Sequence, residues 1–542
     1  MHFSAGLDRL AHDALASLPN AISRLWDRDP TLWTPDPEHH AVAQNRLGWL
    51  DAPYVDLDPS LGALQTSLAA EGVRHAILLG MGGSSLCPDV LRRVGGTRGL
   101  DFHVLDSTHP ESVAACEARV DLLRTVFIVA SKSGGTIEVR SFYQYFRHRV
   151  PNPNAFIAIT DPGSPLQALA HQEGFRACFL NPPDIGGRYS ALSLFGLVPA
   201  CLLGMDSSTL LASARTMAEA CRRPPAENPG FGLGSVLGAA ARSGRNKLTL
   251  ALSPDIAPLG SWIEQLVAES TGKEGQGILP VDGEPLGGPD DYGRDRVFVS
   301  VSTPGHAPEG LESLEAAGHP VIRWQISGPD ALGGEFFRWE VATAVAAAVM
   351  QVDPFDEPNV AAAKRLSGEQ LELHAQSGQI AESNLISKAD GVSARGRAAI
   401  ASSPAEALER HLDRIGEGDY LALLAFLPEH PELVAELESL RLSIRRKYRV
   451  ATTVGFGPRF LHSTGQLHKG GPGTGVFVQF TANGACDLPV PGHNYSFAVL
   501  CAAQARGDEL ALEEAERRVI RIHLGDQPGS ALRHLREALI KR

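Results

Sequence analysis

Short apolar segments alternate with helical segments between about residues 60 and 205, and this alternation constrains the fold more than any other feature. Alternating strands and helices are typical of a parallel sheet that is covered by helices on both faces. Ligands of such sheets lie beyond the carboxyl ends of the strands, so the turns that follow the apolar segments are the first candidates for a site. We expect these strands at 76–79, 102–105, 126–129, 156–159 and 177–180.

Two of these turns are rich in glycine and in hydroxyl side chains. The turn at 80–85 reads Gly-Met-Gly-Gly-Ser-Ser, and the turn at 131–136 reads Ser-Lys-Ser-Gly-Gly-Thr. Glycines let the backbone approach a ligand closely, and free N–H groups at a helix start attract an anion. A hydroxyl at a helix start is often only an N-cap, which accounts for one hydroxyl of the second turn but not for three. The two turns together predict a phosphate site.

Composition narrows the identity of the ligand. The formal charge of −13 disfavours nucleic acids and anionic membranes, so local donors must hold a phosphate. Neither turn matches a nucleotide-binding fingerprint. The seven cysteines are scattered without Cys-x-x-Cys spacing, and no His/Cys/Asp set has metal-ligand spacing. We therefore expect a small phosphorylated metabolite as the ligand, a reducing compartment, and neither a metal nor an organic cofactor.

The rest of the sequence indicates a second α/β unit and a C-terminal region. A second α/β unit is expected from strands at 248–252, 277–280, 297–301 and 321–325, closed by a helix over 336–350. After residue 365 the pattern is mostly helical, with a glycine-rich segment at 454–475. The start of the chain has neither a secretory nor a membrane-spanning pattern, so we expect a cytoplasmic protein. The predicted divisions are a helical arm (1–45), two α/β domains (46–205 and 206–368) and a helical C-terminal region with a glycine-rich active-site loop (369–542).

Three other stretches carry candidate chemistry. Arg188 lies in a Gly-Gly-Arg-Tyr-Ser turn directly after the fifth expected strand. Gln265 and Glu269 are spaced i,i+4 and so share one helix face. Lys364 follows the segment Asp-Pro-Phe-Asp-Glu-Pro-Asn at 353–359. From position alone, a solvated carboxylate on a helix is the commoner fate of a residue such as Glu269, and Lys364 could be a surface lysine.

Taken in order, these five motifs resemble the phosphoglucose isomerases, over about residues 42 to 525. The segments 45–50 and 459–471 look like the form of this enzyme that is fused behind a transaldolase, although no transaldolase-sized region precedes them here. The resemblance implies two sugar-isomerase (SIS) type three-layer α/β domains with parallel sheets. It also implies reversible interconversion of glucose 6-phosphate and fructose 6-phosphate, a step in glycolysis and gluconeogenesis, without a cofactor. An amphipathic N-terminal arm would suit a homodimer, although a simple surface helix is the commoner outcome.

The resemblance also implies roles for individual residues. Glu269 would be the base, Arg188 would stabilise developing negative charge, and Lys364 would help a histidine to open the sugar ring. One carboxylate can move a proton between adjacent carbons through an enediolate, which agrees with a single catalytic glutamate. The residues implied to bind the substrate are Gly82, Gly83, Ser84, Ser131, Lys132, Ser133, Thr136 and Gln265.

Two departures from the family pattern affect the expected site. Most members carry the ring-opening histidine in an Asn-Gly-Gln-His motif between the glutamate and lysine motifs, and this chain has none there. We expect His468 to take its place, with His462 as the second choice, because an imidazole moves protons near neutral pH. Glu357 stands where the family usually has glutamine, and a carboxylate facing a phosphate dianion would repel it.

Two alternatives of other kinds remain open from the sequence. A sugar-phosphate sensor would need the phosphate turns but not Glu269 with Arg188 and Lys364, and it would normally carry a DNA-binding domain, which we do not find. An isomerase of another sugar phosphate, such as mannose 6-phosphate, would use the same residues because C2 epimers share one enediolate.

Overall fold

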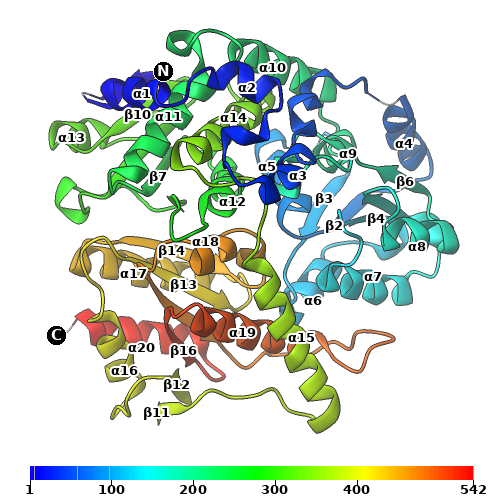
Figure 1. Ribbon diagram of the computed structural model, residues 1–542. Helices are drawn as coiled ribbons and strands as arrows, with labels where there is room; N and C mark the ends of the chain where they lie inside the picture. The colour runs from blue at the N-terminus through cyan, green and yellow to red at the C-terminus, as the bar shows by residue number, and fades with distance from the viewer. Residues whose placement is uncertain (5, 58, 97, 541–542) are drawn as a thin grey trace.

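The computed structural model describes residues 1–4, 6–57, 59–96 and 98–540, and it contains three sheets (Figure 1). The first sheet has five parallel strands in the order β3-β2-β4-β5-β6. Every residue of the central strand β4 is buried, as expected for a strand covered on both faces. The strands are β2 (His75–Leu79), β3 (Asp101–Leu105), β4 (Thr125–Ala130), β5 (Phe156–Thr160) and β6 (Ala177–Leu180).

The second sheet has the order β1-β10-β9-β7-β8 and is parallel except for β1. The parallel strands are β7 (Lys247–Leu252), β8 (Leu279–Val281), β9 (Arg296–Ser302) and β10 (Val321–Gln325). These two sheets confirm the predicted pair of parallel α/β units. Their helices are α4 (Pro59–Ala70), α5 (Leu86–Gly95), α6 (Pro110–Ala118), α7 (Ile137–Arg149), α8 (Pro165–Glu173), α9 (Leu194–Leu202), α10 (Ser207–Ala220), α11 (Pro229–Arg242), α12 (Leu259–Thr271), α13 (Leu311–Ala316) and α14 (Leu332–Met350).

The N-terminal arm differs from the expectation that it is purely helical. Its first residues form β1 (His2–Phe3), which pairs antiparallel with β10 at the edge of the second sheet. The arm continues through α1 (Leu7–Ala16), α2 (Ala21–Trp26) and α3 (Pro37–Gln44). The Trp33 indole donates a hydrogen bond to the Ala344 carbonyl at 2.8 Å, so the arm is packed into its own chain.

The C-terminal region was expected to be mostly helical, and this prediction is wrong. It contains a six-stranded sheet in the order β11-β12-β16-β15-β13-β14, below the other two sheets in Figure 1. Both faces of a central strand such as β13 are buried, and a continuous apolar run of this kind cannot be told from a buried helix by periodicity. The strands are β11 (Leu385–Ala389), β12 (Val392–Gly396), β13 (Tyr420–Phe426), β14 (Ala451–Phe456), β15 (Gly475–Thr481) and β16 (Arg518–His523).

Helices cover this third sheet and join it to the rest of the molecule. The long helix α15 runs downward from near the middle of the molecule and lies along α19 (Figure 1). In the part of the chain that the structure describes, no helix combines the length and apolar character that crossing a membrane requires. The helices are α15 (Val360–Ser377), α16 (Pro404–Leu412), α17 (Pro431–Tyr448), α18 (Gly465–Gly470), α19 (Phe497–Glu514) and α20 (Pro528–Ile540).

Candidate active site

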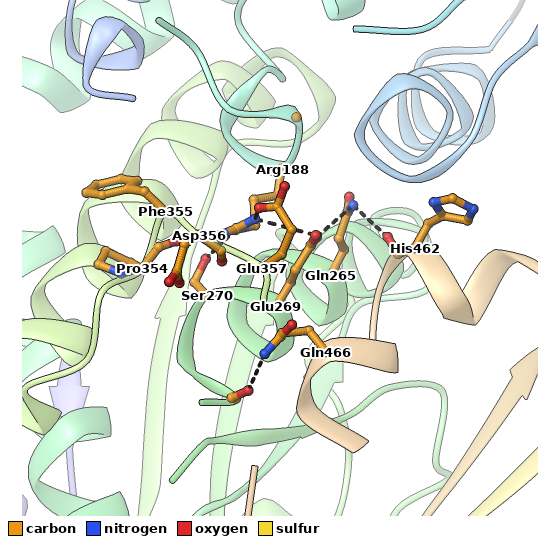
Figure 2. Close-up of polar contacts among 12 residues, drawn as sticks. Arg188, Gln265, Glu269, Ser270, Pro354, Phe355, Asp356, Glu357, His462 and Gln466 are labelled. Carbon is orange, nitrogen blue, oxygen red and sulfur yellow. Dashed lines mark hydrogen bonds and ion pairs between the residues drawn. The ribbon is translucent and has the colours of Figure 1, made fainter. Parts of the chain in front are cut away.

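Arg188 lies at the centre of the polar cluster that the sequence motifs form (Figure 2). It belongs to the short 3-10 turn Gly187–Tyr189, and only 4% of its side chain is exposed. Burial alone would lower its pKa, but the carboxylates of Glu269 and Glu357 hold it above its ordinary value. Its partners are Glu269 Oε1 (3.4 Å), Glu357 Oε2 (3.0 Å), Ser270 Oγ (2.9 Å), and the carbonyls of Pro354 (2.6 Å) and Asp356 (2.9 Å).

Glu269 faces this guanidinium from the last turns of α12. The Gln265 amide donates to Glu269 Oε2 at 3.1 Å and also to the His462 carbonyl at 2.8 Å. Burial raises the pKa of Glu269 above its usual value, although the charge of Arg188 opposes this shift. The carboxylate is therefore oriented by its neighbours and is a stronger proton acceptor than an exposed glutamate.

The first glycine turn supports this cluster by allowing close backbone packing. A Cβ on Gly83 would lie 2.0 Å from the carbonyl oxygen of Gly187, beside Arg188. Gly82 has a φ of +54°, and a Cβ there would lie 2.9 Å from both the Gln265 amide nitrogen and the His462 carbonyl. Ser84, which ends this turn, is buried. Larger residues at 82 and 83 would displace the groups that position Glu269 and Arg188.

The second turn presents its hydroxyls in different ways. Thr136 occupies the N-cap position of α7 but makes no capping hydrogen bond, and its Oγ1 lies 3.0 Å from Ser131 Oγ. Ser131 and Ser133 accept hydrogen bonds from the N–H groups of Gly134 (3.1 Å) and Gly135 (3.3 Å). The Lys132 ammonium instead pairs with Asp161 and donates to the Pro183 carbonyl at 2.9 Å.

A cavity of about 310 Å³ connects this turn with α15 and with the segment before α18. Lys364 is exposed on α15 and lines the cavity. The cavity is wide enough for a small metabolite. Its polar lining includes Ser133, Thr136, Glu138, Lys364, His462 and Gln504.

The structure brings His462, and not His468, to this cavity. His468 is 1% exposed, with its Nδ1 3.0 Å from the Tyr420 hydroxyl, and burial holds its pKa well below the usual range. His468 lies on α18, which carries it into the interior against Phe477. The second choice from the sequence, His462, therefore replaces it as the candidate histidine.

Glu138 is a site residue that the sequence analysis missed. Its Oε1 lies 2.9 Å from His462 Nε2 and accepts a hydrogen bond from the Gln504 amide at 2.7 Å. Burial would raise the pKa of this carboxyl, but the imidazole of His462 and, more weakly, the ammonium of Lys364 hold it below its usual value. The one signal in the sequence that could have indicated a site residue here is its position two residues after Thr136, in the first turn of the helix that follows the turn 131–136.

Gln466 and Lys273 hold the loop that receives Arg188. The Gln466 amide donates to the Gly272 carbonyl at 3.0 Å, and its Oε1 accepts from the Asn359 N–H at 2.9 Å. Lys273 is buried and forms an ion pair of 2.7 Å with Asp356, and burial lowers its pKa to about 8. These contacts fix the loop from which Glu357 reaches Arg188.

Folding also assembles two small His/Asp groups that spacing along the sequence does not show. His75 and His103 both contact Asp101, at 3.0 and 3.1 Å. His39 lies 3.6 Å from Asp356 and 3.9 Å from Asp353. Because these partners pair with one another, we assign neither group a metal.

The chain is similar in sequence to a known protein family and to several of its members. The family model for phosphoglucose isomerase matches residues 63–278. The chain is 31% identical over 262 residues to a glucose-6-phosphate isomerase of Thermus thermophilus, covering 46% of this chain and 62% of that protein. It is 28% identical over 367 residues to the glucose-6-phosphate isomerase of Rubrobacter xylanophilus, covering 55% and 82%. The chain thus spans a little under two thirds of the Thermus relative.

Two solved structures share the fold. A hypothetical protein from Thermus thermophilus aligns with a TM-score of 0.58 at 24% identity, over 68% of this chain and 99% of that chain. A glucose-6-phosphate isomerase from Chlamydia trachomatis aligns with a TM-score of 0.50 at 17% identity, over 68% of this chain and 84% of that chain.

Proposed function

We propose that this chain belongs to the phosphoglucose isomerase family, whose model matches residues 63–278, and that it interconverts glucose 6-phosphate and fructose 6-phosphate. The observation that carries the proposal is the Glu269 carboxylate, whose side chain is 12% exposed and which is held between the Gln265 amide and the Arg188 guanidinium. This arrangement suits proton transfer between two adjacent carbons. A protein that only binds sugar phosphates would have no use for it.

In the proposed mechanism Glu269 removes the proton from C2 of the open-chain aldose and returns it to C1. The intermediate is an enediolate, whose oxygen carries developing negative charge. Arg188 cannot lose its own charge and is held in place by several acceptors, so it can stabilise that oxygen without reorganising. A preorganised donor of this kind lowers the barrier by about 3 kcal/mol.

We assign ring opening to His462, with Glu138 as its partner. The Glu138 carboxylate lies 2.9 Å from His462 Nε2 and so fixes which ring nitrogen faces it. His462 can then exchange a proton with the ring oxygen or with the anomeric hydroxyl. Lys364 lines the same cavity and would supply a second positive charge.

The phosphate is proposed to bind at the turn 131–136, where Thr136 and Ser133 line the cavity. Free N–H groups at the start of α7 add to the hydroxyl donors. In this proposal the phosphate and the reacting carbons lie at opposite ends of a small sugar, with the phosphate at the turn and the reacting carbons beside Glu269.

The test is the variant Glu269→Gln, which keeps size and polarity but removes the base. We expect turnover to fall by at least about 100-fold with little change in the affinity for a phosphorylated sugar acid. The matched control is Glu264→Gln on the same helix, because burial raises the pKa of Glu264 to about 8 and the glutamine resembles its neutral form. Equal turnover in both variants would demote Glu269 to a structural carboxylate.

A further inference from the structure

A second and larger cavity, of about 700 Å³, lies in the C-terminal region outside the proposed active site. It lies at the carboxyl ends of β15 and β16, where Thr481 and His523 line it. In this sheet β13 lies between β14 and β15. The chain passes from β13 to β14 on one side and then to β15 on the other side, so the connections change direction between β13 and β15. Phe426, which ends β13, also lines the cavity. Open parallel sheets bind ligands at such divergence points.

The sheet face below this cavity is polar where an ordinary covered face is apolar. The opposite face packs Ala394, Ile520 and Ile522 into a core. On the cavity side, the strand registers place Arg395 beside Arg521, and Ser393 beside His523 in the next row. Neighbouring strands are about 4.8 Å apart, so the two guanidinium groups emerge close together. Helix α19 covers this face and adds Ala498, Cys501, Ala502 and Ala505 to the lining.

Both arginines already hold an anionic group. Arg521 donates to the Glu382 carboxylate at 2.6 Å, and Arg395 lies 3.2 Å from the same oxygen. Glu382 belongs to the loop after α15, and 57% of its side chain is exposed. The position between the two guanidinium groups therefore already binds a carboxylate. Because that carboxylate is exposed to solvent, another anion can displace it.

Two further groups are available to a ligand. Lys388 is exposed at the cavity, and its ammonium makes no ion pair or hydrogen bond with the residues that the structure describes. His109 is 5% exposed and lines the cavity from the first α/β unit, and its Nδ1 has no hydrogen-bond partner within the described residues. An unpartnered buried nitrogen costs free energy unless a ligand or a water satisfies it.

We propose that this cavity is a second ligand site, which binds a small anion, organic or inorganic, with more than one negatively charged group. Arg395 and Arg521 bind one anionic group in the place of Glu382, and Lys388 binds another. Guanidinium pairs are suited to carboxylate and phosphate groups. The alanine-rich face of α19 leaves room for the carbon skeleton.

The site is also placed to influence the proposed active site. Ala498, Ala502 and Ala505 line the second cavity from one face of α19, whereas Leu500 and Gln504 line the first cavity from another. Gln504 donates to Glu138 and accepts from Thr108 at 2.6 Å, next to His109. A ligand that shifts α19 would therefore alter the partner of His462.

Calorimetric titration of the full chain with pyrophosphate, and separately with citrate, tests the proposal. We expect binding of at least one probe, weakened about 10-fold or more by Arg395→Met and by Lys388→Met, because each removes a charged donor. Ala502→Trp should block the cavity from the exposed side of α19 without removing any charge. Its matched control, Ala69→Trp on the exposed face of α4, should leave binding unchanged.

Thr136→Val separates this site from the phosphate turn. The proposed component of binding survives in Thr136→Val and is lost in Arg395→Met and Ala502→Trp. Binding that is lost in Thr136→Val and retained in the other two would place the anion at the active site and overturn the proposal. Absence of binding for both probes at millimolar concentration would also overturn it, whatever the isomerase assays show.

Discussion

Removing the hydroxyl of Thr136 separates ligand binding from helix capping in the second turn. Thr136 stands at the N-cap of α7, where loss of a capping side chain usually costs about 1 kcal/mol. Its Oγ1 makes no such bond, however, and instead lies 3.0 Å from Ser131 Oγ at the cavity. Valine keeps the branched shape, so we expect Thr136→Val to change the free energy of unfolding by less than about 1 kcal/mol.

The effect on ligand binding should be larger. A hydrogen bond from a hydroxyl to a charged phosphate is worth roughly 1.5–3 kcal/mol, which corresponds to a rise of about 10- to 100-fold in the substrate constant. Some loss of turnover should accompany it, because phosphate binding also orients the sugar over Glu269.

The assay combines a melting curve with the inhibition constant of a phosphorylated sugar acid. Thr216→Val on α10 is the control, because its exposed hydroxyl donates to the Ala212 carbonyl within the same helix. Unchanged inhibitor binding in a destabilised Thr136→Val protein would refute the reasoning. It would mean that the turn caps a helix and that the phosphate binds elsewhere.

Three further predictions follow from single side chains. The charge of Glu357 raises the pKa of Glu269 in addition to the effect of burial. Because activity needs Glu269 ionised, Glu357→Gln should move the acidic limb of the kcat/KM profile to lower pH. An unmoved limb would mean that Glu357 does not influence the base. His468→Phe should leave turnover within about threefold while changing the melting temperature, and a large kinetic defect would restore His468 to the site. Glu284 is fully buried between two arginines, at 3.4 Å from each. Glu284→Gln should therefore lower the free energy of unfolding, measured by denaturant titration, by about 3–5 kcal/mol. A loss below about 1 kcal/mol would contradict this.

The first two sheets could be predicted because their strands are short, apolar and separated by helices with clear turns. The third sheet could not, because strands such as β13 are buried on both faces and show no alternation. The edge strand β1 has two residues, which is too short for any periodic pattern. Its pairing with Ile322 and Arg323 depends on how the folded chain places the free edge of β10.

The candidate site, too, could be predicted only in part from the sequence. Gln265 and Glu269 share one face of α12, as their i,i+4 spacing predicts, whereas the contact between Arg188 and Glu269 joins two distant segments and depends on the folded chain. The choice between His462 and His468 could not be made from spacing. The short helix α18 turns His468 toward Tyr420 in the interior, and only the folded chain brings Glu138 to His462.

The most direct test of the account is a coupled assay of the purified protein with fructose 6-phosphate as the only sugar. We predict that glucose 6-phosphate forms in proportion to the protein added and that Glu269→Gln abolishes this activity. Formation of mannose 6-phosphate instead would keep the enediolate chemistry but change the substrate. A folded protein that binds fructose 6-phosphate and releases no aldose phosphate would contradict the central claim and favour a sugar-phosphate sensor.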